Sequence, residues 1–546
     1  MFYPFYRKFI GLLLMLVFTG GLYSQKLRYT HADSLRGGIG KSRIWWDLKH
    51  YDLHVAFNYA DSSISGKNSI RYKVLEADQI MQIDLMEPMR LDSVVQDGKT
   101  CTFSKDGNAY FVQLSNAQHK EAIKTLITYF HGKPHVAKQP PWDGGLIWTK
   151  DARQRPWISI ACQGMASSVW FPSKDHQYDE VDSCSLHFTV PSDLVAVSNG
   201  RMRGIDQISN GKAVYHWEVK NPINNYNIIP YIGYYANFKD TVQGEGGVLQ
   251  LDYWVLQENV ELAKKQFAQV KPMLRCFEYW FGKYPFYEDG YKLVEAPYLG
   301  MEHQSAIAYG NKFKNGYLGT DLSLTGWGLK WDFIIVHESG HEWFGNNITV
   351  KDVADNWVHE GFTAYSECLF TQYLFGKKAA SDYVIGTRIG VQNDEPIIAD
   401  YNVNRDGSSD MYYKAANMLH GIRQIVNNDS LWRVMLRGLN SDFWHQTVSS
   451  RQVEDYMMKF LKLDLQKVFD QYLRTKQIPV LEYKLKENTF SFRWTNCVKH
   501  FDMPLKLEFA DRDYWINPTE KWQKVELTSA DFKIDPDFFV RTKKVN

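Results

Sequence analysis

Alternation of hydrophobic and polar residues dominates the first part of the chain, from about Trp45 to Phe238. Residues 64–72 and 186–190 are clear examples, and Gly, Asn and Asp residues separate such segments. A period of two places alternate side chains on opposite faces of a strand, so the pattern predicts half-buried β-strands joined by turns. A loop rich in Pro and Gly interrupts them at residues 131–145. We therefore predict an N-terminal β-sandwich or saddle domain over residues 25–242.

The pattern changes near the glycine-rich residues 244–247 and then becomes mainly helical. Residues 256–283 have helical spacing apart from Pro272, and residues 291–296 have the length and composition of a short strand. Helical patterns continue to about Thr475. We predict a second domain, mainly α-helical, over residues 243–476.

Two helices of this region are predicted to be buried. Residues 331–336 are almost continuously apolar, and Gly345 with Asn346 supplies a stop signal. A second helix is predicted to begin near Asp355, which is a good N-cap residue, and to end before Gly376. A later helix begins near Tyr412 and carries an apolar stripe formed by Met418, Leu419, Ile422, Ile425 and Val426.

The last part of the chain returns to alternation after Pro479, which predicts a small C-terminal β-sandwich over residues 477–546. A length of 546 residues exceeds a single ordinary core, so two to four domains are expected. The predicted fold class is therefore multidomain α+β, with a β domain, a mainly α domain and a small β-sandwich in that order.

Composition narrows the function classes. An apolar content of 44% and a charged content of 23% are typical of a globular protein. The net charge of +1 gives no bulk attraction to nucleic acid or to an anionic membrane, so no nucleic-acid partner is predicted. The six cysteines are widely scattered, and the positions of Cys368 and Cys162 favour buried free thiols, although a bridge between Cys162 and Cys184 stays open.

The N-terminus has the features of a secretory signal peptide over residues 1–24. Arg7 and Lys8 precede an apolar stretch at residues 9–22, which is too short to span a bilayer comfortably. Cleavage is predicted after Ser24. We expect an exported protein, periplasmic or secreted, with no stable membrane span after cleavage, and an uncleaved anchor is the alternative.

The strongest chemical signal is the string His337-Glu338-Ser339-Gly340-His341, which Glu360 follows after 18 intervening residues. Histidines at positions i and i+4 lie on one face of a helix and can bind one zinc ion. A carboxylate from the next helix can supply the third ligand and leave one position for water. We predict a single zinc ion per chain, held by His337, His341 and Glu360. The alternative is a buried helix with two hydrogen-bonded core histidines.

Two further carboxylates have predicted roles at this site. Glu338 follows the first ligand directly, so it lies beside the metal and can act as general base and acid. Glu367 lies two helical turns after Glu360 and can accept the second N–H of a ligand histidine. The alternative for Glu367 is a solvated charge on the helix surface.

Around these residues the chain resembles the aminopeptidase-N-like zinc aminopeptidases, a gluzincin family. The run HESGHEWFGNNITVKDVADNWVHEGFTAYSE is similar to the zinc region of that family almost throughout. Upstream, Gly300-Met301-Glu302-His303 resembles its G-x-M-E-N motif, and downstream Tyr412-Tyr413-Lys414-Ala415 resembles its Y-x-K-G segment. Segments near Gln163 resemble its N-terminal domain, so the similarity spans roughly residues 45–475.

The resemblance implies a thermolysin-like catalytic domain and roles for further residues. Glu302 would bind the free ammonium group of a peptide, with Gln163 beside it and Gly300 and Met301 contacting the substrate. Tyr412 would donate a hydrogen bond to the oxyanion, and Tyr413 is the rival for that role.

Four positions depart from the family pattern. Aligned on Met301 and Glu302, Leu299 occupies the first position of the G-x-M-E-N motif, where the family has Gly, and His303 the last, where it has Asn. Ala415 replaces the Gly of Y-x-K-G, and Glu342 replaces a Gln after the second histidine. None of these is a predicted metal ligand.

Together these features predict a zinc-dependent aminopeptidase that hydrolyses the N-terminal residue of peptides with a free amine. Two alternatives stay open: a gluzincin endopeptidase, and a catalytically inactive peptide-binding or scaffold protein on the same fold. Blocked-end substrates distinguish the first alternative, and metal content with turnover distinguishes the second.

Overall fold

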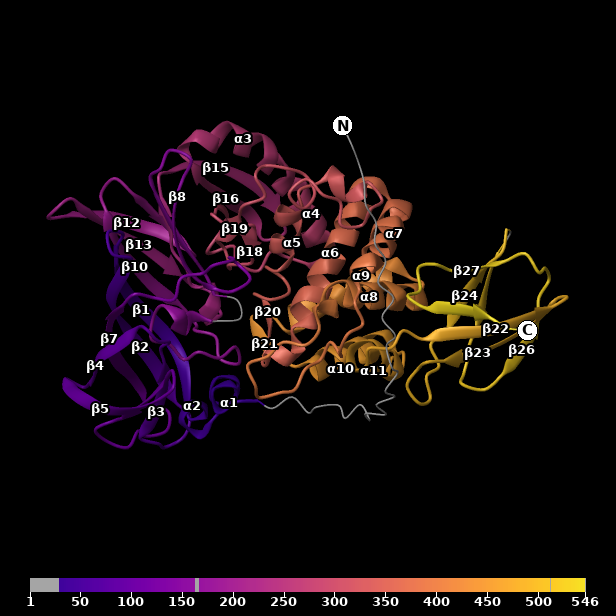
Figure 1. Cartoon of the computed structure of the whole chain (residues 1–546), viewed down its shortest axis with the longest axis horizontal. Helices are drawn as coiled ribbons and strands as arrows, with labels where there is room; N and C mark the ends of the chain where they lie inside the picture. Colours follow the sequence, from indigo (N-terminus) through magenta and orange to yellow (C-terminus); the bar gives the residue numbers. More distant parts are fainter. Residues whose placement is uncertain (1–28, 163–165, 511, 546) are drawn as a thin grey trace, which may run out of the picture.

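The computed structural model describes residues 29–162, 166–510 and 512–545, and this part of the chain forms three regions in sequence order (Figure 1). Strands of the first region lie at one end, helices fill the middle, and short strands form the other end. The predicted multidomain α+β class is confirmed. The predicted signal peptide lies outside the described residues, and no helix of the described part is long and apolar enough to cross a membrane.

The first region is built on two sheets. In the described residues, the larger sheet has the strand order β12-β13-β10-β1-β2-β7-β4-β5-β6-β3, and the smaller has the order β11-β14-β9-β8. The larger sheet contains β1 (Trp46–Asn58), β2 (Ser63–Val74), β3 (Ile80–Asp84), β4 (Arg90–Gln96), β5 (Lys99–Asp106), β6 (Ala109–Gln113), β7 (Ile123–Gly132), β10 (Cys184–Pro191), β12 (Arg201–Ile208) and β13 (Lys212–Val219). The smaller contains β8 (Gly145–Lys150), β9 (Pro156–Ala161), β11 (Val195–Val197) and β14 (Tyr231–Gly233), and the helices α1 (His31–Gly37) and α2 (Lys41–Ile44) precede both.

Alternating burial explains why these segments are strands. Strand β10 buries every second residue, so its apolar side chains enter the core and its polar side chains remain half-exposed. Strand β1 joins the sheet centrally, because it pairs in parallel with β10 and antiparallel with β2. Both segments that alternate most clearly in the sequence are strands, β2 and β10.

A further sheet begins the middle region. Its strand order is β15-β16-β17-β19-β18, formed by β15 (Tyr235–Gly244), β16 (Gly247–Leu256), β17 (Tyr291–Glu295), β18 (Gly300–Met301) and β19 (Ile307–Tyr309). Strands β15 and β16 form one hairpin that pairs from Tyr235 with Leu256 to Gly244 with Gly247. The glycine-rich segment at residues 244–247 is thus a hairpin turn, and the predicted division between residues 242 and 243 lies inside this hairpin.

Helices dominate the rest of the middle region, as expected. They are α3 (Val260–Gln266), α4 (Val270–Phe281), α5 (Phe333–Gly340), α6 (Trp357–Phe375), α7 (Lys377–Gly386), α8 (Tyr413–Val426), α9 (Asp429–Asp442), α10 (Ser450–Leu461) and α11 (Gln466–Arg474). The strands β20 (Ile348–Val350) and β21 (Gln446–Val448) form a small parallel pair between them. Every residue of α5 is buried, which agrees with its continuous apolar sequence.

Two helix ends differ from expectation. Helix α5 ends at Gly340, earlier than Gly345, because tight turns follow it and the N–H of Trp343 bonds to the carbonyl of Gly340. Helix α6 begins at Trp357 rather than at Asp355. The Asp355 carboxylate does not cap the helix, since it accepts hydrogen bonds from the backbone N–H of Ser450 and from the Tyr401 hydroxyl.

The third region contains two small sheets with the orders β26-β23-β22-β28 and β25-β24-β27. Its strands are β22 (Val480–Lys486), β23 (Thr489–Thr495), β24 (Leu505–Glu508), β25 (Asp513–Ile516), β26 (Gln523–Glu526), β27 (Lys533–Ile534) and β28 (Arg541–Lys544). This region lies beyond the helices, away from the N-terminal sheets (Figure 1).

All six cysteines are described, and all six are free thiols. The bridge between Cys162 and Cys184 that the sequence leaves open therefore does not form. Cys162 and Cys184 are both fully buried, and burial raises the pKa of each thiol.

Candidate active site

Helices α5 and α6 bring together three side chains that could hold a metal ion, those of His337, His341 and Glu360. Oxygen Oε2 of Glu360 lies 3.6 Å from Nε2 of His337 and 3.3 Å from Nε2 of His341. Ligand atoms that bind one tetrahedral zinc ion at about 2.0–2.1 Å lie about 3.3–3.4 Å from each other, so the observed spacing fits such an ion. All three side chains are buried. Two imidazoles and a carboxylate are also the donor set of hydrolytic zinc sites.

Hydrogen bonds orient both imidazoles toward this point. Nitrogen Nδ1 of His337 donates to Oε1 of Glu367 at 2.7 Å, and the other Glu367 oxygen accepts from the Tyr383 hydroxyl at 2.6 Å. Nitrogen Nδ1 of His341 lies 3.0 Å from the carbonyl oxygen of Phe344, to which it donates. Because each Nδ1 atom carries the proton, each Nε2 atom presents a lone pair to the metal position.

Electrostatics keep the third ligand ionised. Burial alone would raise the pKa of Glu360, but His341 and then His337 outweigh this effect and lower that pKa. A carboxylate must be deprotonated to bind a metal, so the two imidazoles favour the form that coordinates.

Glu338 lies in the same cleft, against the edge strand β18. A Cβ atom on Gly300 would lie 2.8 Å from Oε1 of Glu338, so only glycine lets the strand approach this carboxylate so closely. Burial raises the pKa of Glu338 to about 7. A carboxylate with a pKa near neutrality can both take and return a proton at physiological pH.

Glu302 follows β18 and is only 4% exposed. One oxygen of its carboxylate accepts a hydrogen bond from the Tyr226 hydroxyl at 3.0 Å. Glu302, Glu338 and His341 each place one donor atom within 4.8 Å of the others. Two carboxylates this close to one another attract a cation, and an ammonium group at this point would be next to the metal position.

Tyr412 and Tyr413 both line the cleft but have different neighbours. The Tyr412 ring stacks on the His337 ring with 6.0 Å between centroids. Burial, and then the nearby Glu360 carboxylate, raises the pKa of Tyr412 well above its usual value. The pKa of Tyr413 is raised by burial and then by Glu367, so Tyr412 is the tyrosine closer to the metal-binding carboxylate.

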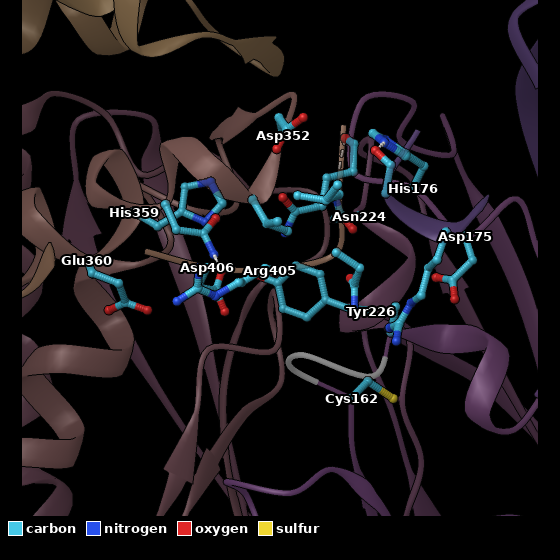
Figure 2. A pocket seen from close by; sticks show the side chains of 18 of the residues that line it. Cys162, Asp175, His176, Asn224, Tyr226, Asp352, His359, Glu360, Arg405 and Asp406 are labelled. Carbon is cyan, nitrogen blue, oxygen red and sulfur yellow. Dashed lines mark hydrogen bonds between the residues drawn. The ribbon is translucent and has the colours of Figure 1, made fainter. Parts of the chain in front are cut away.

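A cavity continues from the metal group on the side of Glu302 (Figure 2). Glu360 lies at one side of it, Asp175 and His176 lie at the opposite side, and Tyr226 and Asp406 lie between them. Its lining residues come from the N-terminal region, from Glu302, from residues 352–360 and from residues 403–406 before α8, so the cavity lies between the N-terminal region and the helical region.

The remaining predicted residues have distinct positions. Gly300 and Met301 form β18 and are buried beside the cleft. Gln163 lies outside the described residues, so its predicted contact stays a prediction. Sequence reasoning missed Tyr226, which is 76 positions from Glu302, and Trp142, which lines the cleft and is 67% exposed. Trp142 belongs to the loop of residues 131–145, whose interruption of the strand pattern was its only signal.

Two of the four residues that depart from the family pattern, Glu342 and His303, are buried and contact the segment around Glu302. Glu342 accepts hydrogen bonds from the Tyr284 hydroxyl at 2.6 Å and from the backbone N–H of Ser305 at 3.0 Å. His303 is fully buried beside the Tyr231 hydroxyl, and burial lowers the pKa of His303 to about 3. Glu342 thus holds the segment after Glu302, and His303 remains neutral within it.

Comparisons with known proteins agree with this geometry. Residues 266–472 match the model of the Peptidase family M1 domain. Leukotriene A-4 hydrolase of Xenopus laevis is 20% identical over 452 residues, which cover 76% of this chain and 69% of that protein. Aminopeptidase N of Lactobacillus helveticus is 23% identical over 472 residues, which cover 81% of this chain but only 52% of that protein.

The fold is also found among solved structures. The M1 zinc metallopeptidase of Deinococcus radiodurans superimposes with a TM-score of 0.67 at 19% identity, over 80% of this chain and 95% of that chain. The region that matches the family model, residues 266–472, contains the helices α5 and α6, the strand β18 before them, and helix α8, which follows Tyr412. On this evidence residues 266–472 form a domain similar to that of Peptidase family M1, and the fold of the chain is that of an M1 zinc metallopeptidase.

Proposed function

We propose that this protein is a zinc-dependent aminopeptidase. The observation that carries the proposal is the position of Glu302, whose carboxylate lies within 4.8 Å of the general-base candidate Glu338 and of the ligand His341. In a peptide, only one Cα atom separates the terminal amine from the first carbonyl carbon. An amine held at Glu302 therefore presents the first peptide bond, and no later one, to the metal position.

The chemistry divides among few side chains. His337, His341 and Glu360 would hold zinc, which supplies a Lewis acid and lowers the pKa of water to about 7 when bound. Glu338 takes the proton of the attacking water and passes it to the leaving amine. Tyr412 donates its hydroxyl proton in a hydrogen bond to the oxygen that becomes negatively charged. Glu302 holds the substrate ammonium, and Gln163 is proposed to hydrogen-bond the same end.

The relatives support this class of substrate. Aminopeptidase N is among the similar proteins, and a variant of the Deinococcus radiodurans enzyme was solved bound to a Tyr-Ser-Ala substrate. We place the first side chain of the substrate in the cavity of Figure 2, between Tyr226 and Asp406. The rest of the peptide would leave through the cleft past Trp142.

The test compares free and N-acetylated peptides of the same sequence, with and without a zinc chelator. We expect release of the first residue from the free peptide, no cleavage of the acetylated one, and loss of activity on chelation. Equal cleavage of both peptides would identify an endopeptidase. A stoichiometric metal without turnover of either peptide would identify a peptide-binding protein.

Two variants separate recognition from chemistry. Glu302→Gln removes a charged partner of the ammonium, which contributes up to about 3 kcal/mol, so kcat/KM for free peptides should fall by roughly 100-fold. Glu338→Gln should retain zinc and lose nearly all turnover, because a glutamine amide cannot accept the proton of the attacking water. Full activity of either variant would contradict the role of that residue.

We further propose that the protein is exported, on the basis of residues 1–24 alone. Fractionation of cells that express the full chain, with N-terminal sequencing of the product, tests this. A mature N-terminus at Gln25 outside the cytoplasm is expected, and a cytoplasmic product that retains Met1 would contradict it.

A further inference from the structure

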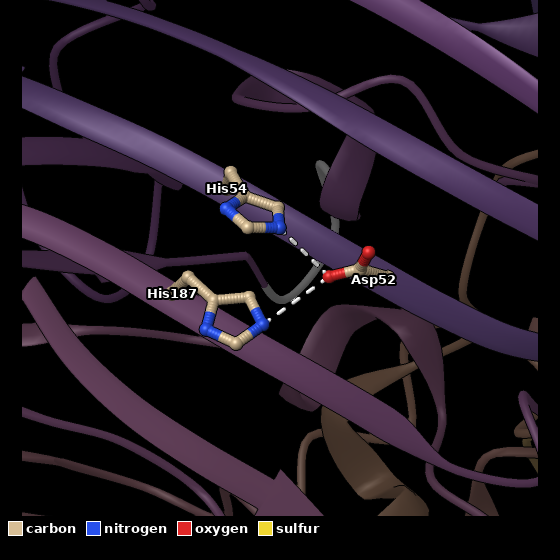
Figure 3. A group of neighbouring side chains, drawn as sticks. All are labelled: Asp52, His54 and His187. Atoms are coloured by element: carbon tan, nitrogen blue, oxygen red, sulfur yellow. Dashed lines mark ion pairs between the residues drawn. The ribbon is translucent and has the colours of Figure 1, made fainter. Parts of the chain in front are cut away.

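A row of imidazoles crosses the half-exposed face of the large N-terminal sheet. His54 on β1 is the register partner of His187 on β10, and His187 is the partner of His216 on β13. Asp52 lies two residues before His54, so its side chain is on the same face of β1 (Figure 3). None of these residues belongs to the cleft of the candidate active site.

Three atoms in this row are arranged like metal ligands. Oxygen Oδ1 of Asp52 lies 2.9 Å from Nε2 of His54 and 3.2 Å from Nε2 of His187, and Figure 3 shows both nitrogens facing that oxygen. Ligands at about 2.0–2.1 Å from one ion, at angles of 90–109°, lie about 2.9–3.4 Å apart, so both separations fit. The corresponding distances at the candidate zinc site are 3.3 and 3.6 Å.

The orientation of the two imidazole rings relative to Asp52 differs from that of a hydrogen-bonded ion pair. Neither nitrogen is aligned for a hydrogen bond to Asp52, and among the described residues the buried Oδ1 atom accepts none. The rings of His54 and His187 stack with 4.2 Å between centroids, so charging both would place two cations face to face. An ion between the three atoms satisfies the oxygen while both imidazoles remain neutral.

The neighbouring residues hold one ring in the required tautomer. Nitrogen Nδ1 of His187 lies 2.6 Å from Nδ1 of His216, and Nε2 of His216 lies 3.1 Å from a carboxylate oxygen of Asp206. Asp206 can only accept, so His216 carries its proton on Nε2 and accepts from His187 at Nδ1. The proton of His187 is then on Nδ1, which leaves its Nε2 lone pair directed at Asp52. Ligand histidines are typically oriented by such second partners.

We propose that Asp52, His54 and His187 form a second metal site, which binds a divalent first-row transition ion of the zinc type. Imidazole donors favour Zn²⁺, Ni²⁺ or Cu²⁺ over Mg²⁺ and Ca²⁺, which prefer oxygen. The side chains of His54, Asp52 and His187 are 40%, 37% and 20% exposed, so solvent can complete the coordination. The ion joins β1 to β10 across a separation of 133 residues and stabilises the pairing of these strands.

The test is calorimetric titration of Zn²⁺ into tag-free protein that already carries one zinc ion per chain. We expect one further equivalent to bind, and no binding of Mg²⁺ under the same conditions. His187→Gln and the isosteric Asp52→Asn should each abolish the second equivalent and leave peptidase activity unchanged. His216→Gln should weaken it by about 10- to 100-fold, because the variant loses only the orienting partner.

His131→Gln is the matched control, since His131 on β7 makes an aligned contact of 2.7 Å with Asp92 and belongs to no group of three metal-binding side chains among the described residues. This variant should bind the second zinc ion like the unmodified protein. The proposal is overturned if the unmodified protein binds no second equivalent with a Kd below about 0.1 mM, or if His187→Gln and Asp52→Asn, folded by circular dichroism, bind it unchanged.

Discussion

Replacement of Glu367 by glutamine isolates the contribution of a residue that contacts no substrate and, on the proposed ligand set, no metal. Glu367 is fully buried, and its carboxylate accepts one hydrogen bond from His337 and one from Tyr383. A hydrogen bond to a charged group contributes about 1.5–3 kcal/mol, and a neutral one about 0.5–1.5 kcal/mol. Replacing the carboxylate by the neutral amide therefore weakens the hydrogen bond that holds the His337 ring by about 1–1.5 kcal/mol.

This difference should appear in zinc affinity. Each 1.4 kcal/mol is a factor of ten, so the zinc Kd of Glu367→Gln should rise by about tenfold, which is the lower end of the range for such partners. Competition with a fluorescent chelator measures the Kd directly. The value of kcat at saturating zinc should change far less, because the variant retains every group that contacts the substrate.

Tyr383→Phe is the matched control, because Tyr383 donates the other hydrogen bond to the Glu367 carboxylate. It removes the other hydrogen bond to Glu367 but leaves the carboxylate charged, so the zinc Kd should stay within about threefold of the original while the free energy of unfolding falls by about 1–3 kcal/mol. A Glu367→Gln protein that is folded and binds zinc within twofold of the unmodified protein would refute the reasoning. A larger loss in Tyr383→Phe than in Glu367→Gln would do the same.

Three further predictions concern turnover, pH and metal. Tyr412→Phe should lower kcat by about 10²- to 10³-fold with unchanged zinc content, whereas Tyr413→Phe should have a small effect; the reverse order in a steady-state assay would exchange their roles. Burial raises the pKa of Glu180 from 4.5 to about 8. Between these values the folded protein holds a proton that the unfolded chain has lost, so the free energy of unfolding falls as pH rises, by at most about 1.4 kcal/mol per unit. Glu180→Gln should remove this part of the slope between pH 5 and 8 in denaturant titrations, and an unchanged slope would count against it. Removal of zinc should lower the free energy of unfolding by about 4 kcal/mol relative to protein in free zinc at 1,000 times Kd, and calorimetric melting that is indifferent to chelation would contradict a bound ion.

The sequence is sufficient to predict the group of His337, His341 and Glu360, because these residues lie close together along the chain. His337 and His341 are one helical turn apart, and Glu360 is carried by the next long helix. Tyr226 could not be found in this way, since only the completed fold brings it to Glu302 from the N-terminal region. The spacing of Asp52 and His54 is visible in the sequence, but the register that places His187 beside them depends on a parallel pairing that no local pattern encodes.

The predicted division near residue 243 and the predicted end of α5 also depend on contacts that a local sequence pattern does not encode. The glycine-rich segment at residues 244–247 has the composition of a linker, yet its two flanking strands pair along their whole length. Composition alone does not distinguish a hairpin turn from a domain junction, because both require glycine. The end of α5 differs from the sequence prediction for a related reason, since the turn that stops it is formed by backbone hydrogen bonds within residues 340–348 rather than by a single glycine.

Two regions of the molecule hold Glu302 in place. Tyr226 reaches this carboxylate from the N-terminal region, while Asn346, in the turn after α5, donates to the backbone carbonyl of the same residue at 2.9 Å. Glu302 is thus held by the N-terminal region and by the turn after α5 at the same time. A shift of the N-terminal region would move Tyr226 away from Glu302, so on the proposed function the choice of peptide bond depends on how these two regions pack together.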